Sequence, residues 1–403
     1  MKRILTFLFL LSLFTQCYQD IAPISLIPQP TVATQPEVAC DFSNGRPEIT
    51  VQLTPVGKLS QAREGMAVAS TGTKILFAGA FQSYPSPSSP LAGSGSTTVD
   101  IYDIVTHTWS TAKLSKWRYS IAAVASGNKV FFAGGRVGVG DPDSDQLFAT
   151  VDIYDVSTNT WSVASLSEPR AAVGAAAVGN KVFFAGGEKS GSYDTSNQVD
   201  IYDLSTGTWS ATRLSESRAY IAAVTADDKI YFAGGHIDYR WYAEPSSAID
   251  IYDNQTNSWT TSRLEEPKAM FSGIAVNNKI YWAGSMIGSV HGGAPVKSIC
   301  AVEIRDINTQ TSSVDYLSKP GHWVPVDGQN AVLKDNKILY FRHYDTADPV
   351  RFDIYDTVTQ SWSIGVLPKS ILGASVISVN NTVYIAGGRV NGVVSNQVWK
   401  LEF

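Results

Sequence analysis

The chain has 403 residues, of which 44% are hydrophobic and 17% charged, and its formal net charge is −5. It is therefore long and apolar enough to bury a large core. The acidic balance argues against general binding to nucleic acid or to an anionic membrane surface, because both partners require a basic protein face.

The first residues have the features of an export signal. Lys2 and Arg3 precede an apolar run over residues 4–14, too short to span a bilayer comfortably, and Cys17 follows it closely. This pattern resembles a bacterial lipoprotein signal, whose cysteine becomes the lipidated first residue, although Gln16 stands where a small residue is usual. We expect residues 1–17 to export the protein to the cell envelope and to anchor it at the outer membrane through Cys17. An ordinary cleaved signal and a segment that stays attached to the protein are the alternatives.

Residues 18–46 contain four prolines and no strand pattern, which predicts an extended tether. This tether contains Cys40. If Cys17 carries lipid, Cys40 and Cys300 are the two cysteines that remain. Export would allow them to form a disulfide, and two free buried thiols are the other possibility.

A repeat fills residues 47–403. Each of its seven copies opens on a leucine, and successive leucines lie 48 to 55 residues apart. A period of this length predicts stacked β units that bury their faces against one another. Most copies contain an apolar strand ending in two glycines, a variable loop, a strand similar to Val-Asp-Ile-Tyr-Asp and a Thr-x-Thr-Trp turn. The opening leucines are Leu59, Leu114, Leu166, Leu214, Leu264, Leu317 and Leu367.

Two marks of the repeat resemble the kelch family. The glycine pairs are Gly134-Gly135, Gly186-Gly187, Gly234-Gly235 and Gly387-Gly388. The spaced aromatic pairs are Tyr102 and Trp109, Tyr154 and Trp161, Tyr202 and Trp209, Tyr252 and Trp259, and Tyr355 and Trp362. The resemblance implies an all-β, seven-bladed β-propeller with four antiparallel strands, A to D, in each blade. It leaves function open, because kelch propellers serve as enzymes, peptide readers and scaffolds.

The two ends of the repeat region complete one blade. The last copy supplies an A strand near Ser370–Val379, a B strand at Thr382–Gly388 and a C strand at Gln397–Phe403, and no D strand follows. We expect Ile49–Thr54 to supply it. Such a join removes an open sheet edge.

The loops and a set of cations suggest which face binds a ligand. The AB turns are tight and the BC loops long, so we assign recognition to the face formed by the BC loops and DA connections. Four residues after the first five opening leucines stand Arg63, Arg118, Arg170, Arg218 and Lys268. We expect them to circle a mouth of the central channel.

Kelch proteins that bind acidic peptides have arginines at the matching position, so the resemblance implies that Arg118, Arg170 and Arg218 grip carboxylates. In the alternative, each arginine pairs with a blade carboxylate such as Glu168 or Glu216 and clamps the blades.

The sixth copy departs from the pattern at two places. Arg342-His343 replaces the glycine pair, and Gly321-His322-Trp323 replaces the arginine segment. Because local rules tend to fail at functional sites, we predict ligand contacts at His322, Trp323, Arg342 and His343. Divergence of a decaying repeat is the alternative.

Motifs for cofactor chemistry are missing from the sequence. It has no dinucleotide or P-loop glycine motif, no close histidine spacing for zinc and no nucleophile elbow. We therefore expect no cofactor and no metal. The preferred hypothesis is a monomeric binding or scaffold protein that recognises an acidic peptide, protein or glycan. The alternative is an exported sugar-modifying enzyme similar to kelch-type N-acetylneuraminate epimerases, with His343 as the base.

Overall fold

The computed structural model describes residues 41–80, 95–137, 146–189, 194–237, 244–287, 297–319, 331–341 and 350–403. These residues belong to one compact unit, Cys40–Phe403. Every regular element among them is a β-strand. Within these ranges no helix is present that could cross a membrane.

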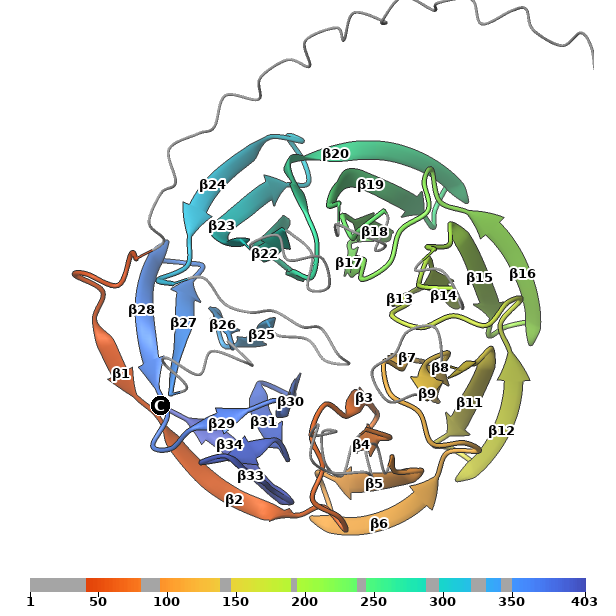
Figure 1. Ribbon diagram of the computed structural model, residues 1–403, viewed down its shortest axis with the longest axis horizontal. Coiled ribbons are helices and arrows are strands. Elements are labelled where there is room, and N and C mark those ends of the chain that lie inside the picture. The colour runs from red at the N-terminus through yellow and green to blue at the C-terminus, as the bar shows by residue number, and fades with distance from the viewer. Residues whose placement is uncertain are drawn as a thin grey trace, which may run out of the picture. The chain divides into compact units, whose positions relative to one another are not determined.

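The residues in these ranges form seven sheets of four or five strands that stand radially around a centre (Figure 1), which confirms the predicted all-β propeller architecture. The A strands lie nearest the centre and the D strands form the outer rim. Blade one contains β3 (Ala67–Thr71), β4 (Lys74–Ala78), β5 (Thr98–Asp103) and β6 (Thr108–Lys113). Blade two contains β7 (Ala122–Ser126), β8 (Lys129–Ala133), β11 (Thr150–Asp155) and β12 (Thr160–Ser165).

Blades three to five follow the same order. Blade three contains β13 (Gly174–Val178), β14 (Lys181–Ala185), β15 (Gln198–Asp203) and β16 (Thr208–Arg213). Blade four contains β17 (Ala222–Ala226), β18 (Lys229–Ala233), β19 (Ser246–Asp253) and β20 (Ser258–Lys268). Blade five contains β21 (Ser272–Val276), β22 (Lys279–Ile287), β23 (Lys297–Asp306) and β24 (Ser312–Tyr316).

Both ends of the repeat region meet in the last two blades. Blade seven contains β30 (Ser375–Val379), β31 (Thr382–Ala386), β34 (Gln397–Glu402) and the N-terminal strand β2 (Gln52–Lys58). Strand β2 pairs antiparallel with β34, so the predicted closure is confirmed, with the D strand shifted a few residues along the chain. The shift arises because β1 (Glu48–Thr50) instead pairs in parallel with β28 of blade six.

Blade six has five strands. They are β25 (Ala331–Lys334), β26 (Lys337–Tyr340), β27 (Arg351–Asp356), β28 (Ser361–Val366) and β1. Two small accessory sheets extend the BC ends of blades two and seven. They contain β9 (Arg136–Val137) with β10 (Gln146–Leu147), and β29 (Ile371–Leu372) with β32 (Arg389–Val390) and β33 (Val393–Val394).

The repeated tyrosines and tryptophans pack each blade against its neighbour. Tyr154 of blade two, for example, is buried in the apolar cluster of blade one, and Tyr252 of blade four in that of blade three. Within a blade the tyrosine lies against the tryptophan on the adjacent strand, with ring centroids 4.8 Å apart for Tyr102 and Trp109. Large aromatic areas at this spacing make the blade interfaces the main hydrophobic core.

The glycine pair joins one blade to the next through the backbone. The Gly135 amide donates to the Arg170 carbonyl of the next blade at 2.9 Å, and the Gly388 amide to the Arg63 carbonyl at 2.9 Å across the ring closure. At Gly134 φ is +65°, and a Cβ there would lie 2.4 Å from the Arg170 carbonyl oxygen. No side chain fits this approach, which explains the pair.

In blades one to six, the last aspartate of the C strand holds the CD turn. Asp103 Oδ1 accepts hydrogen bonds from the amides of Val105, at 3.0 Å, and Thr106, at 3.1 Å. The hydrogen bond from Thr106, aided by that from Val105, lowers the pKa of Asp103 to about 2. These aspartates are therefore parts of the turns, as their position before a threonine-rich turn predicts.

Candidate functional site

The predicted basic ring lies inside the blades. The side chains of Arg63, Arg118, Arg170 and Arg218 are fully buried, and Lys268 is 1% exposed. Each arginine pairs with the first aspartate of the C strand in its own blade. The partners of Arg63, Arg118, Arg170 and Arg218 are Asp100, Asp152, Asp200 and Asp250, and the Arg118–Asp152 distance is 2.9 Å.

The arginine also binds the backbone of its blade. Arg63 Nη1 donates to the carbonyls of Gly79 at 2.9 Å and Thr98 at 2.7 Å, and Asp100 in turn accepts from the Ser60 amide at 2.9 Å. One ion pair thus ties the entry of strand A to strands B and C. This geometry supports the clamp alternative and corrects the expectation that the ring grips a ligand, because a guanidinium without solvent exposure cannot meet one.

The partner in the clamp differs from the one that the sequence suggested. Glu168 Oε1 lies 3.8 Å from Arg170 Nε, and Glu216 Oε1 lies 3.8 Å from Arg218 Nε, so both glutamates are secondary partners. The C-strand aspartate is the primary one.

Blades five and seven have other residues at the two positions of the arginine–aspartate clamp. In blade five, burial lowers the pKa of Lys268 and raises that of Glu303, and the attraction between them opposes both shifts. In blade seven, Ile371 and Trp399 occupy the two positions and share an apolar cluster. The clamp can therefore be ionic or apolar.

A different set of polar side chains lies at the end of the blades where the BC loops leave. These are the residues directly after the glycine pairs: Arg136, Glu188, His236 and Arg389. Arg136 pairs with Glu188 of the next blade, and Glu188 Oε1 lies 3.8 Å from Nε2 of the fully buried His236. The network therefore crosses blades two, three and four.

Arg389 completes this set on the other side of the ring. Its Nε and Nη2 each donate to Glu64 of blade one at 2.7 Å. The Glu64 side chain is 2% exposed and that of Arg389 is 34% exposed. A buried carboxylate thus fixes the orientation of a guanidinium that reaches solvent.

The residues that lead into the A strands hold a strained backbone. Ser120, Ala172, Tyr220 and Met270 all have φ of 51° or 52°, while Gly65 and Gly373 take the same place in blades one and seven. The left-handed conformation costs a residue with a side chain roughly 1–2 kcal/mol. The same position therefore has a strained backbone in four blades, and strain of this kind is typical of functional sites.

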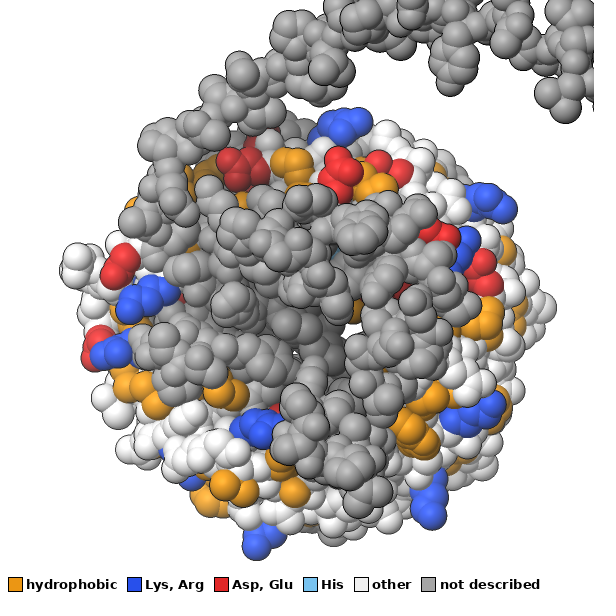
Figure 2. Space-filling model, viewed as in Figure 1, with side chains coloured by type: hydrophobic (Ala, Val, Ile, Leu, Met, Phe, Trp, Pro, Cys, Tyr) orange, Lys and Arg blue, Asp and Glu red, His pale blue; other side chains and the backbone are white. Residues whose placement is uncertain are grey.

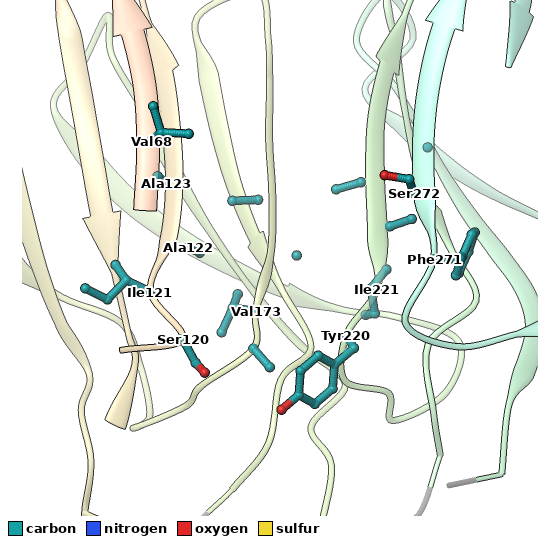
Figure 3. A pocket seen from close by; sticks show the side chains of 16 residues that line it. Val68, Ser120, Ile121, Ala122, Ala123, Val173, Tyr220, Ile221, Phe271 and Ser272 are labelled. Atoms are coloured by element: carbon teal, nitrogen blue, oxygen red, sulfur yellow. The ribbon is translucent and has the colours of Figure 1, made fainter. Parts of the chain in front are cut away.

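A half-open cavity of about 190 Å³ lies between the inner strands of blades one to five. The residues around it include Val68, Ile121, Val173, Ile221 and Phe271, and the side chains of the last four are buried in the blade cores. Figure 3 shows Ser120 and Tyr220 at one end of the cavity and Val68 toward the other. The Tyr220 ring also lies 5.0 Å from the His236 ring, so the cavity and the polar network adjoin each other.

Charge is dispersed on the face that Figure 2 presents. The described lysine and arginine side chains of this face are scattered toward the rim. Among the described residues no group of three histidine, cysteine, aspartate or glutamate side chains could hold a metal ion.

Several predicted residues lie outside the described ranges: His322, Trp323, Arg342, His343 and Cys17. Cys300 is disulfide-bonded, which supports the paired alternative over two free thiols.

The network of Arg136, Glu188 and His236 was not predicted, although the sequence contains a signal for it. The position after the glycine pair changes from arginine to glutamate to histidine in otherwise similar repeats.

Comparison with known proteins gives a family match. A family model described as the KLHDC2/KLHL20/DRC7 Kelch-repeats domain matches residues 65–285 and, in a second alignment, residues 120–341. Among solved structures, one titled "Structure of YjhT" aligns with a TM-score of 0.48 and 14% identity, covering 85% of this chain and 95% of that chain. No curated protein matches the chain.

Proposed function

Since this chain belongs to the kelch-repeat family, we propose that it is a binding or scaffold protein that recognises its partner through the face of the BC loops and DA connections. The fold by itself does not separate a binding protein from an enzyme. The choice depends on how the described residues differ from blade to blade.

One observation carries the proposal. The arginine–aspartate clamps recur in blades one to four and the turn aspartates in blades one to six, whereas the residue after the glycine pair varies among Arg136, Glu188, His236 and Arg389. Variation concentrated at one end of a repetitive scaffold is what a recognition surface requires.

We propose that the partner is an acidic peptide, protein or glycan. The arginines of the basic ring are buried, so the candidate residues for contact with this partner are Arg136 and Arg389. Their side chains are 12% and 34% exposed, respectively. A carboxylate of the neighbouring blade orients each guanidinium. A fixed guanidinium loses little freedom when it binds an anion, and its fork matches a carboxylate.

The location of the protein is part of the same proposal. The signal-like residues 1–17 support export, with a lipid on Cys17 holding the chain at the outer membrane. Radiolabelled palmitate incorporated into the wild type but not into a Cys17→Ser variant would support the anchor. Equal labelling of both would contradict it.

A glycan and acidic-peptide binding screen on the full chain tests the recognition proposal. Arg136→Gln and Arg389→Gln should each weaken binding of the strongest ligand about tenfold, which corresponds to about 1.4 kcal/mol. Lys129→Gln is the matched control, because Lys129 pairs with Asp155 at the opposite end of strand β8. Affinity should fall as salt rises.

Two outcomes would count against this proposal. Equal affinity of the wild type and both arginine variants would remove these contacts. Conversion of N-acetylneuraminate by the wild type would favour the enzyme alternative.

A further inference from the structure

One position of the repeat carries a charge that changes sign around the ring. It is the second residue after the opening leucine, on the DA connection that leads to the arginine–aspartate clamp. Blades three, four and five have glutamate there, and we call these residues the acidic arc. Blades two, six and seven have lysine, the basic arc. The residues, in chain order, are Lys116, Glu168, Glu216, Glu266, Lys319 and Lys369. Figure 2 shows acidic side chains gathered over the part of the ring where Figure 1 places blades three to five.

The clamp does not require a particular charge at this position. Gln61 occupies it in blade one, where the buried ion pair of Arg63 with Asp100 is intact. Lys116 occupies it in blade two, and the corresponding ion pair is present there as well. Because the clamp forms beside glutamate, glutamine and lysine alike, the sign of the charge is free to serve recognition.

A serine hydroxyl fixes the orientation of two glutamates of the acidic arc. Ser196 Oγ donates to Glu168 Oε1, and Ser246 Oγ donates to Glu216 Oε1. Blade one has the same contact with its glutamine, at 2.8 Å, so the serine does not select for a charge either. The side chains of Glu168 and Glu216 are 33% and 37% exposed. A partly exposed carboxylate that is already oriented loses little freedom when it binds a cation.

An aromatic ring supports two lysines of the basic arc. Lys116 Nζ lies 5.0 Å from the ring centroid of Phe148, and Lys369 Nζ lies 5.0 Å from that of Trp399. Phe148 occupies, in blade two, the repeat position of the serines that orient the glutamates. The charged residue and its support therefore change together, since the face of an aromatic ring attracts a cation. This matched change indicates that both arcs are built to present their charge.

From these observations we propose that the two arcs bind a polypeptide in which a basic segment lies beside an acidic one. The basic segment meets the acidic arc. The acidic segment meets the basic arc, whose blades two and seven also hold Arg136 and Arg389. The inference rests on the proposed recognition through this face and narrows the partner to a polypeptide, because lysine and arginine side chains supply the cations. The order of the arcs also sets the direction in which the partner lies.

Two peptides of the same composition test the inference on the full chain. The block peptide has six lysines, a flexible glycine–serine linker and six glutamates. In the second peptide, lysines and glutamates alternate on both sides of the same linker. Fluorescence anisotropy at low salt measures both affinities. The block peptide should bind at least tenfold more tightly, because only its charges match both arcs at once. Equal affinities would overturn the inference.

Neutral variants assign the basic segment to the acidic arc. Glu216→Gln and Glu266→Gln should each weaken binding of the block peptide about threefold, as expected for an exposed charge pair, without weakening that of hexaglutamate. Glutamine is also the residue of blade one at this position, so both variants should fold, which circular dichroism checks. Glu168 is left unchanged because Lys189 Nζ lies 3.8 Å from its Oε2. Glu402→Gln is the matched control, since Glu402 is exposed at the end of β34 away from the DA connections.

Failure of this inference is distinguishable from failure of the recognition proposal. If Glu216→Gln and Glu266→Gln bind the block peptide as tightly as the wild type does, or lose no more affinity than Glu402→Gln, the acidic arc has no role in binding. If instead Arg136→Gln and Arg389→Gln bind hexaglutamate as tightly as the wild type does, the proposed recognition of an acidic partner fails.

Discussion

Arg46 Nη1 lies 3.0 Å from the fully buried carboxylate of Asp353 in blade six. In blades one to four, the corresponding aspartate pairs with an arginine of its own repeat. The guanidinium also donates to the Tyr316 carbonyl and lies 4.8 Å from the Trp362 ring centroid. The sixth repeat has Gly321 at the arginine position. The N-terminal segment therefore supplies the cation of blade six and docks beside it as β1.

Replacing Arg46 with alanine should destabilise the protein by about 3 kcal/mol, because it leaves a buried carboxylate without its cation. Urea unfolding measures the change. Arg351→Ala is the control, since it removes a pair between the same segment and blade six that is solvent-exposed, Arg351 with Glu48, and should cost less than about 1 kcal/mol. Equal losses in the two variants would refute the special role of Arg46.

Blade seven indicates that an apolar pair can replace the ionic clamp. Arg218→Met should destabilise the chain by about 3–5 kcal/mol, because Asp250 remains buried and unpaired. Adding Asp250→Leu should recover more than half of that loss. Chemical denaturation of the two variants checks this, and a double variant less stable than the single one would contradict the interpretation.

The repeat made the fold predictable to a large extent. The fifty-residue period, the glycine pairs and the Tyr–Trp spacing identified the propeller and its closure, because each mark has a local physical cause that recurs in every blade. Strand bounds at the closure were off by a few residues. The pattern of residues 48–50 predicts a strand but does not indicate which strand it pairs with. The parallel pairing of β1 with β28 of blade six was therefore not predictable from the sequence.

The candidate site was less predictable, and the arginines show why. The sequence places Arg118 and Arg170 at the start of an inner strand, but only the three-dimensional structure shows that the side chains turn into the blade toward Asp152 and Asp200. The partner aspartates lie inside a repeated strand motif, so the sequence did not mark them as the partners of the arginines. Long-range pairing of this kind leaves a signal in sequence only as matched changes, such as Ile371 with Trp399.

Gly134→Ala should cost more stability than Gly207→Ala, although both glycines have a positive φ. At Gly134 a Cβ would meet the Arg170 carbonyl oxygen of the next blade at 2.4 Å, whereas at Gly207 the nearest atom is the Tyr202 hydroxyl at 3.8 Å. Both variants bear the cost of the left-handed backbone, roughly 1 kcal/mol, and only Gly134→Ala adds the clash. Thermal unfolding measures the difference, and indistinguishable melting temperatures would argue against the close contact between blades.

Acid should weaken the fold through the turn aspartates. Hydrogen bonds from the Thr106 and Val105 amides lower the pKa of Asp103 from 3.8 to about 2, and Asp155, Asp203, Asp306 and Asp356 also have lowered pKa values. Between these two pH values the unfolded chain binds more protons than the folded one. The stabilisation is therefore complete above pH 3.8 and is lost as the pH falls toward 2.

Asp103→Asn tests this directly, because an amide keeps a hydrogen-bond acceptor in the turn but does not titrate. The free energy of unfolding, measured between pH 2 and pH 5, should fall less steeply with acid than in the wild type. Adding Asp155→Asn should flatten the slope again by a similar amount, since the two turns lie in different blades and act independently. Parallel curves for the wild type and both variants would show that these carboxylates do not carry the acid sensitivity.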